Sequence, residues 1–83
     1  MPQYFFHTHD GTAVIDPDGL EFPGADEARG EAVRIASDVL NGLGPRFWET
    51  GKWILRVTDE NGETICVMTF SGEVPAQLGR IGG

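Results

Sequence analysis

The feature that most constrains the fold is a pair of alternating segments on either side of Asn61-Gly62. Residues 52–59 and 63–70 alternate apolar and polar side chains, as strands with one buried face do. Asn-Gly between them favours a two-residue type I′ turn, because both central residues of that turn need positive φ. Such a turn places three apolar pairs on one face, which we expect to pack on the core: Trp53 with Phe70, Leu55 with Met68 and Val57 with Cys66.

The opposite face of this hairpin is more apolar than a solvated sheet needs. It carries Ile54, Ile65 and Val67 beside Arg56. Exposed apolar patches of this kind often mark the surface on which a partner binds. We therefore predict that Ile54, Ile65 and Val67 form an interaction surface.

A second hairpin is predicted near the start of the chain. Residues 3–9 are rich in aromatic side chains, which favours a strand, and a returning strand is expected over residues 12–16. Asp10-Gly11 lies between them and is another type I′ turn signal. That turn predicts which side chains share the core face: Tyr4, Phe6 and Thr8 with Ala13 and Ile15.

One helix is expected between the two hairpins. Asp16-Pro17-Asp18-Gly19 has the composition of a turn, and Gly24-Ala25-Asp26-Glu27 follows with acidic residues that suit the first turn of a helix. Gly and Pro within residues 41–45 end the helix. Its apolar residues recur at helical spacing and form one stripe: Ala28, Ala32, Ile35, Ala36, Val39, Leu40 and Leu43.

Together these elements predict an α+β fold with the order ββαββ. The expected architecture is a four-stranded antiparallel sheet, in strand order 2-1-3-4, with one helix packed on one face. We expect residues 1–70 to form a single domain, in keeping with a chain of 83 residues. Residues 71–83 are rich in Gly and lack periodicity, which predicts a flexible C-terminal tail.

Charge and composition restrict the classes of partner that the chain can bind. The net charge is −7, and no Lys or Arg precedes Arg29. Because proteins bind phosphate backbones through Lys and Arg, we expect no nucleic-acid partner. No segment resembles a membrane span or a signal peptide, and the lone Cys66 fits a reducing compartment. We therefore expect a cytoplasmic protein that does not bind a membrane.

Two histidines provide the one candidate metal site. His7 and His9 are two residues apart on a predicted strand, so both imidazoles would point to the same face and could hold one ion. Asp10 follows directly and is a further candidate ligand. The alternative is that these are ordinary surface histidines. No pattern indicates a catalytic nucleophile or a catalytic pair of carboxylates, and no cofactor is predicted.

Several segments resemble a known family. They are Tyr4-Phe5-Phe6-His7, the turn at residues 16–19 with Leu20-Glu21, the helix opening Glu27-Ala28-Arg29, and residues 57–62. The chain resembles, over roughly residues 2–70, a family of short proteins from rhizobia and related alphaproteobacteria that is catalogued as a domain of unknown function. This resemblance implies a cytoplasmic bacterial protein without an established activity.

A weaker similarity is to HicB-type antitoxin domains. They also run from a hairpin through a segment like Phe22-Pro23-Gly24 into an Ala-rich helix. This chain differs from them because it lacks a DNA-binding module and has two strands after the helix.

Two functions are compatible with these features. The first is a small non-enzymatic protein-interaction module, expected to form a homodimer or to bind another protein through a sheet edge or through Ile54, Ile65 and Val67. The alternative is a small metal- or ligand-binding protein that uses His7 and His9.

Overall fold

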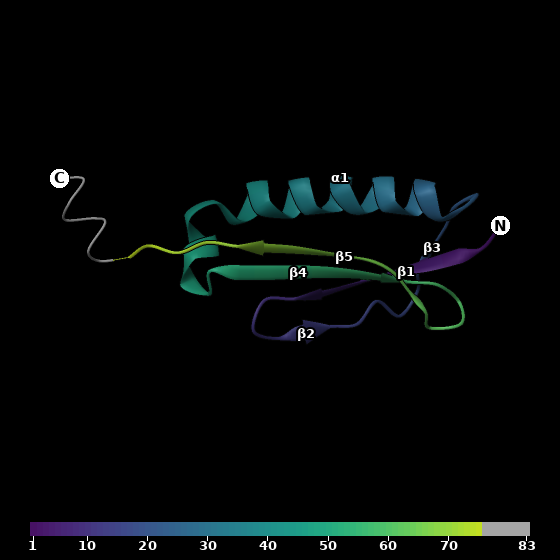
Figure 1. The fold of residues 1–83 in the computed structure, drawn as a ribbon, viewed down its shortest axis with the longest axis horizontal. Coiled ribbons are helices and arrows are strands. Elements are labelled where there is room, and N and C mark those ends of the chain that lie inside the picture. Colours follow the sequence, from purple (N-terminus) through teal and green to yellow (C-terminus); the bar gives the residue numbers. More distant parts are fainter. Residues whose placement is uncertain (76–83) are drawn as a thin grey trace.

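A computed structural model describes residues 1–75 as one sheet with one long helix (Figure 1). Residues 76–83, which make up most of the predicted tail, lie outside the described residues. The α+β architecture is confirmed, since one helix packs on an antiparallel sheet. The elements are β1 (Gln3–His9), β2 (Ala13–Val14), β3 (Leu20–Glu21), α1 (Ala25–Leu43), the 3-10 helix η1 (Gly44–Glu49), β4 (Lys52–Thr58) and β5 (Thr64–Ser71).

The sheet has the predicted strand path but one strand more than predicted. Its order is β2-β1-β4-β5, which matches the expected 2-1-3-4 arrangement. The additional strand, β3, also pairs with β1, so the prediction of four strands was wrong. Tyr4 pairs with Leu20 at the start of β1, and Thr8 pairs with Val14 near its end. One edge of β1 is thus covered in two pieces, and the chain between Val14 and Leu20 leaves the sheet.

The first hairpin differs from its predicted register by one residue. His9 pairs with Ala13, so the loop has three residues, 10–12, instead of two. Gly11 has φ 104°, but no non-glycine residue among the described ones has positive φ, which excludes the type I′ turn at Asp10-Gly11. A shift of one residue moves side chains to the other face of a strand. Ala13 and Ile15 consequently lie with His7 and His9, on the face away from the helix.

The second hairpin has the predicted pairs but a different turn. Trp53 pairs with Phe70, and the two further predicted pairs are also present. Asn61 does not have positive φ whereas Gly62 has φ 81°, so a type I′ turn is excluded here too. The Asp59 carbonyl accepts a hydrogen bond from the Gly62 N–H at 3.0 Å, and its Oδ1 accepts one from the Glu63 N–H at 2.9 Å. This geometry fits a type I turn followed by a glycine bulge.

A second irregularity next to this turn restores the register. Val57 pairs with Cys66 but Thr58 pairs with Thr64, which leaves Ile65 as the extra residue of a bulge. A bulged strand bends, and its extra residue is displaced from the regular alternation. Ile65 packs, partly buried, against the core cluster. Its predicted place on the outer face with Ile54 and Val67 was therefore wrong.

The core lies between α1 and the sheet. The helix presents Ala28, Ala32 and Ala36, each almost fully buried, to side chains of β4 that include the fully buried Leu55 and Val57. Because alanine is small, the helix axis can approach the strands closely. Trp53 is 3% exposed, as predicted for a core residue. The apolar stripe on the helix and the apolar face of the second hairpin are thus confirmed.

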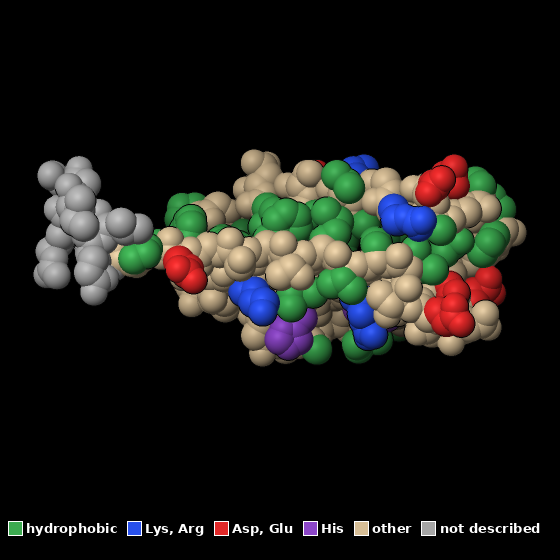
Figure 2. Space-filling model, viewed as in Figure 1, with side chains coloured by type: hydrophobic (Ala, Val, Ile, Leu, Met, Phe, Trp, Pro, Cys, Tyr) green, Lys and Arg blue, Asp and Glu red, His purple; other side chains and the backbone are tan. Residues whose placement is uncertain are grey.

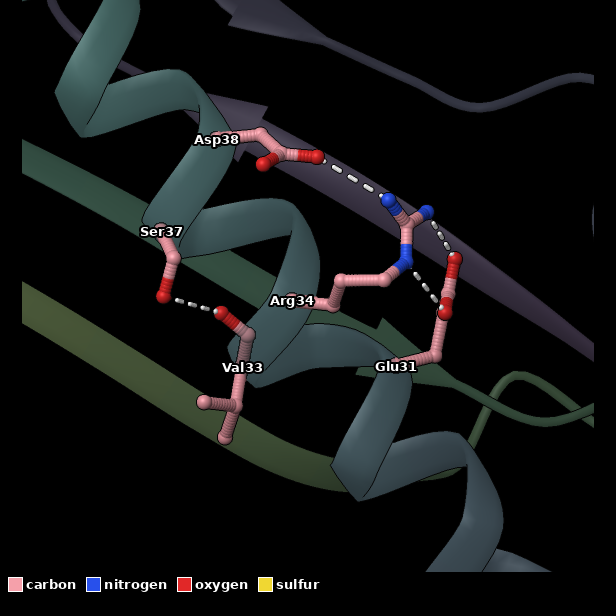
Figure 3. A network of polar contacts seen from close by, with 5 residues as sticks. All are labelled: Glu31, Val33, Arg34, Ser37 and Asp38. Atoms are coloured by element: carbon pink, nitrogen blue, oxygen red, sulfur yellow. Dashed lines mark hydrogen bonds and ion pairs between the residues drawn. The ribbon is translucent and has the colours of Figure 1, made fainter.

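The solvent face of α1 carries a polar network (Figure 3). Arg34 donates hydrogen bonds to Glu31 and Asp38, one turn before and one turn after it, and the Ser37 hydroxyl donates to the Val33 carbonyl. The hydrogen bond from Arg34, opposed by partial burial, lowers the pKa of Glu31 below its ordinary value. The Arg34 side chain is exposed, and ion pairs that stay open to water contribute little to folding stability. We assign them to the solvated side of the helix rather than to a site.

Candidate functional site

The face of the sheet opposite the helix contains a shallow groove. Its volume of about 190 Å³ is smaller than that of small-molecule sites, which usually measure about 300–1,000 Å³. The groove therefore has room for a side chain or two of a partner rather than for a large cofactor. It is lined by residues from β1, β2, β4 and β5 together with the chain after β2: His7, Thr8, His9, Ala13, Ile15, Ile54, Arg56 and Val67.

Strand pairing explains why these residues meet. Arg56 on β4 lies between its partners His7 on β1 and Val67 on β5. Side chains that stand opposite each other on neighbouring strands share a face and touch. Val67 is 54% exposed, so its apolar side chain is available at the surface.

The adjacent row has the same construction. Ile54 on β4 pairs with His9 on β1 and with Thr69 on β5. Ile15, which the revised register moves to this face, is 62% exposed and adds a further apolar side chain to the lining. Of the predicted interaction surface, Ile54 and Val67 belong to the groove, whereas Ile65 does not line it.

The chain that leaves the sheet after β2 is fixed by the carboxylate of Asp16. Its Oδ1 accepts hydrogen bonds from the N–H groups of Asp18 and Gly19, both at 3.1 Å, which closes the predicted turn. Its Oδ2 accepts the N–H of Phe6 at 3.1 Å. In a continuous strand a backbone carbonyl would accept that N–H group. The side chain of Asp16 thus replaces the missing backbone partner at the point where β2 and β3 are interrupted.

These contacts also change the acidity of Asp16. Burial by itself raises the pKa of this carboxyl group, but the hydrogen bonds from Phe6, Gly19 and Asp18 outweigh burial. The pKa of Asp16 therefore lies below its ordinary value. The ionised form of Asp16 is the one that holds this side of the groove together.

His7 is held at the edge of the groove by two hydrogen bonds. Its Nδ1 accepts the N–H of Asp16 at 3.1 Å, so the proton of the neutral ring lies on Nε2. Nε2 then donates to the Thr58 hydroxyl at 2.9 Å. The ring is parallel to that of Phe5, with an interplanar angle of 4° and centroids 6.5 Å apart. Both ring nitrogens are thus engaged, and a metal ion at His7 would have to replace one of these hydrogen bonds.

The other two candidate metal ligands are less constrained. His9 lines the groove on the same face as His7, as predicted, while Asp10 lies in the exposed loop after β1. Within residues 1–75 no group of three or more His, Cys, Asp or Glu side chains is arranged to hold a metal ion. Metal binding by His7, His9 and Asp10 stays a prediction.

The charge of the groove contrasts with that of the whole chain. The net charge is −7, yet no Asp or Glu lines the groove, and Arg56 forms no salt bridge with any acidic group of residues 1–75. Lys52 lies on the same face of β4, two positions beyond Ile54. In Figure 2, Lys or Arg side chains and a His side chain stand beside hydrophobic ones on the lower part of the surface. The groove thus combines an apolar floor with a cationic rim.

Cys66 shows no sign of activation. It lies on β5 and packs, partly buried, against the core cluster. Burial raises the pKa of its thiol above the ordinary value, although the nearby Arg29 opposes that shift. A raised pKa means less thiolate at neutral pH, so this thiol behaves as a small apolar core group.

Comparison with known protein families assigns the chain to one of them. The family described as "Domain of unknown function (DUF6894)" matches residues 3–71, which run from the start of β1 to the end of β5. The chain belongs to this family.

The DUF6894 match confirms the resemblance to a domain of unknown function, and its span agrees with the expected residues 2–70. The alphaproteobacterial source and the likeness to HicB-type domains stay predictions. No curated protein and no solved structure gives a match. Among the described helices of this DUF6894 member, none has the length and apolar character needed to cross a membrane.

Proposed function

We propose that this chain is a small, non-enzymatic protein-interaction module that binds a partner protein in the groove on the sheet face opposite the helix. The observation that supports this most directly is the groove itself, an apolar hollow on a sheet face that no helix covers within residues 1–75. Exposed Ile15 and Val67 leave apolar area in contact with water, and a partner that covers it gains the free energy of burial. We place the module in the bacterial cytoplasm, which the lone Cys66 supports.

The chemistry of the rim suggests which partner fits. Within residues 1–75 Arg56 forms no salt bridge, and Lys52 adds a second positive charge on the same face. A carboxylate next to an apolar side chain would pair with Arg56 while the apolar group enters the groove, because arginine binds carboxylates through two parallel hydrogen bonds. We therefore propose a protein segment in which an aliphatic side chain is flanked by Asp or Glu.

An NMR titration with short blocked peptides tests this proposal. One peptide carries a Leu between two Asp residues, and the matched peptide carries the Leu between two Lys residues. We expect the acidic peptide to shift the backbone signals of His9, Ile54 and Arg56 and to bind about tenfold more tightly than the basic one, which corresponds to about 1.4 kcal/mol. Equal shifts with both peptides, or none at about 5 mM peptide, would contradict the proposal.

Two arginine variants serve as test and control. Arg56→Gln removes the charge at the groove and should abolish the preference for the acidic peptide. Arg34→Gln removes the same charge from the solvent face of α1 and should leave the preference intact. A loss of preference in both variants would mean that net charge, and not the groove, selects the peptide.

A further inference from the structure

Strand β5 ends the sheet and leaves one long edge open. It covers Thr64–Ser71, and within residues 1–75 no strand pairs with its outer side. Natural edge strands are usually protected by charged residues, by proline or by shortness. β5 has eight residues, none charged and none proline. The other side of the sheet is protected, since β2 and β3 have two residues each and the turn held by Asp16 lies between them.

The backbone groups on the open edge can be identified from the hydrogen bonding to β4. The N–H of Gly72 donates to the carbonyl of Gly51 at 2.9 Å, so Gly72 faces β4. In an antiparallel pair, residues whose N–H and C=O groups point to the partner strand alternate with residues whose groups point away. Phe70, Met68 and Cys66 therefore face β4, and the unpaired groups on the open edge belong to Val67, Thr69 and Ser71.

An apolar band runs beside this edge. Figure 2 shows hydrophobic side chains between the helix and β5 along much of the length of the helix. The band is made of side chains that pack against the core but remain partly exposed: Ile35 and Val39 of α1 with Cys66, Met68 and Phe70 of β5. Backbone pairing at the edge would cover this band in the same step.

The distribution of charge indicates what can occupy the edge. Two copies of the chain, each with a net charge of −7, repel each other over most of their surfaces. Between Glu63 and Glu73 the sequence has no charged residue. Two copies can therefore meet along β5 without bringing like charges together. An uncharged strand with an adjacent apolar band is complementary to itself, which is what an interface with two-fold symmetry requires.

We propose that β5 pairs antiparallel with β5 of a second copy of the chain, so that one continuous sheet spans the dimer. The outward-facing residues must pair with each other, and a two-fold axis at Met68 brings Val67 opposite the partner's Thr69. The side chains of Met68 and the partner's Met68 then meet on the helix side, within the apolar bands of both copies. The edge and the groove share only Val67, whose side chain lines the groove while its backbone groups lie on the edge. Pairing of β5 with a second copy is therefore a separate inference that goes beyond the proposed function.

Hydrogen exchange of the unmodified protein tests the pairing directly. The amide hydrogens of Val67 and Thr69, which pair with each other across the two-fold axis, should exchange more slowly, by up to about tenfold, at about 1 mM protein than at about 10 µM, because only the dimer protects them. The amides of Cys66, Met68 and Phe70 face β4 and should be protected at both concentrations. Analytical ultracentrifugation of the same samples gives the oligomeric state. A monomer at about 1 mM, or a dimer whose Val67 and Thr69 amides stay unprotected, overturns the proposal.

A proline variant gives an independent test. Thr69→Pro removes an N–H group that faces solvent in the monomer, and edge strands tolerate proline at such positions. We expect Thr69→Pro to weaken dimerisation at least about tenfold, whereas Thr69→Val, which keeps the N–H group, should dimerise like the unmodified chain. A folded Thr69→Pro variant that dimerises normally overturns the proposal; should circular dichroism show that it is unfolded, the exchange measurement decides. Peptide binding in the groove is a separate readout, so either proposal can fail alone.

Discussion

Loss of the Asp16 carboxylate should destabilise the fold. Asp16→Ala removes three hydrogen bonds, which the carboxylate accepts from Phe6, Asp18 and Gly19. Hydrogen bonds to charged groups contribute about 1.5–3 kcal/mol each, but the site is only partly buried and water can replace some of them. We therefore expect a total loss of about 2–3 kcal/mol. This is a large share of the roughly 4–12 kcal/mol that a domain of this size has.

Thermal unfolding followed by circular dichroism measures this loss. For a domain of this size each kcal/mol shifts Tm by about 4–8 °C, so we expect Asp16→Ala to lower Tm by roughly 10–20 °C. Asp18→Asn is the control, because Asp18 is exposed and is bonded in this turn through its backbone N–H. A Tm for Asp16→Ala within about 2 °C of the unmodified chain would refute the assignment of Asp16 as the group that holds the turn.

The lowered pKa of Asp16 adds a dependence on pH with a definite sign. A carboxyl group whose pKa is lower in the folded than in the unfolded state stabilises the fold above its ordinary pKa, here 3.8, and loses that effect as the pH falls through the folded-state value. Asp16→Asn lacks this ionisation. The difference in unfolding free energy between the unmodified chain and Asp16→Asn should therefore be constant at neutral pH and shrink below about pH 4. A difference that is independent of pH down to pH 2 would refute a lowered pKa for Asp16 in the folded state.

Three further predictions concern single residues. Gly19→Ala should destabilise the fold by about 1–3 kcal/mol in urea titrations, because Gly19 has φ +74° and an added Cβ would lie 2.8 Å from the Phe5 ring; unchanged stability would contradict this packing. Leu55→Ala, at a fully buried position, should cost about 2–5 kcal/mol, whereas the exposed Val67→Ala should cost less than about 0.5 kcal/mol. If the predicted metal site exists, zinc or nickel should raise Tm and His9→Ala should remove that effect; an unchanged Tm with the metals would rule the site out.

The fold was predictable from the sequence where periodicity is strong. The second hairpin and the alanine-rich helix each have one clear apolar face, and burial of Leu55 and Ala32 follows from that pattern. The turns were harder to predict, because Asp-Gly and Asn-Gly occur in two-residue and three-residue loops alike. In both hairpins the longer loop formed, with only the glycine at positive φ. The resulting shift of one residue moved Ile15 to the outer face.

The groove was only partly predictable for a different reason. The sequence placed His7 and His9 on one face of the first hairpin and Ile54 and Val67 on one face of the second. The two sets meet because β1 pairs with β4, and the register of that pairing depends on contacts between segments about fifty residues apart. A single sequence contains no local signal for such a register. The hydrogen bond from Phe6 to Asp16 was unpredictable on the same grounds, since an Asp-Pro turn accounts for the aspartate without it.

The interrupted strand formed by β2 and β3 has a consequence for how far assembly can proceed. A sheet with two usable edges can add copies without limit and grow into a filament. Here the N–H group of Phe6 is already bonded to a side chain of its own chain, at the side where a further molecule would have to join. Under the pairing proposed for β5, growth through that edge alone would end at two copies. Asp16, which fixes one side of the groove, would thereby also prevent strand addition at this edge and so protect the small sheet from forming fibres.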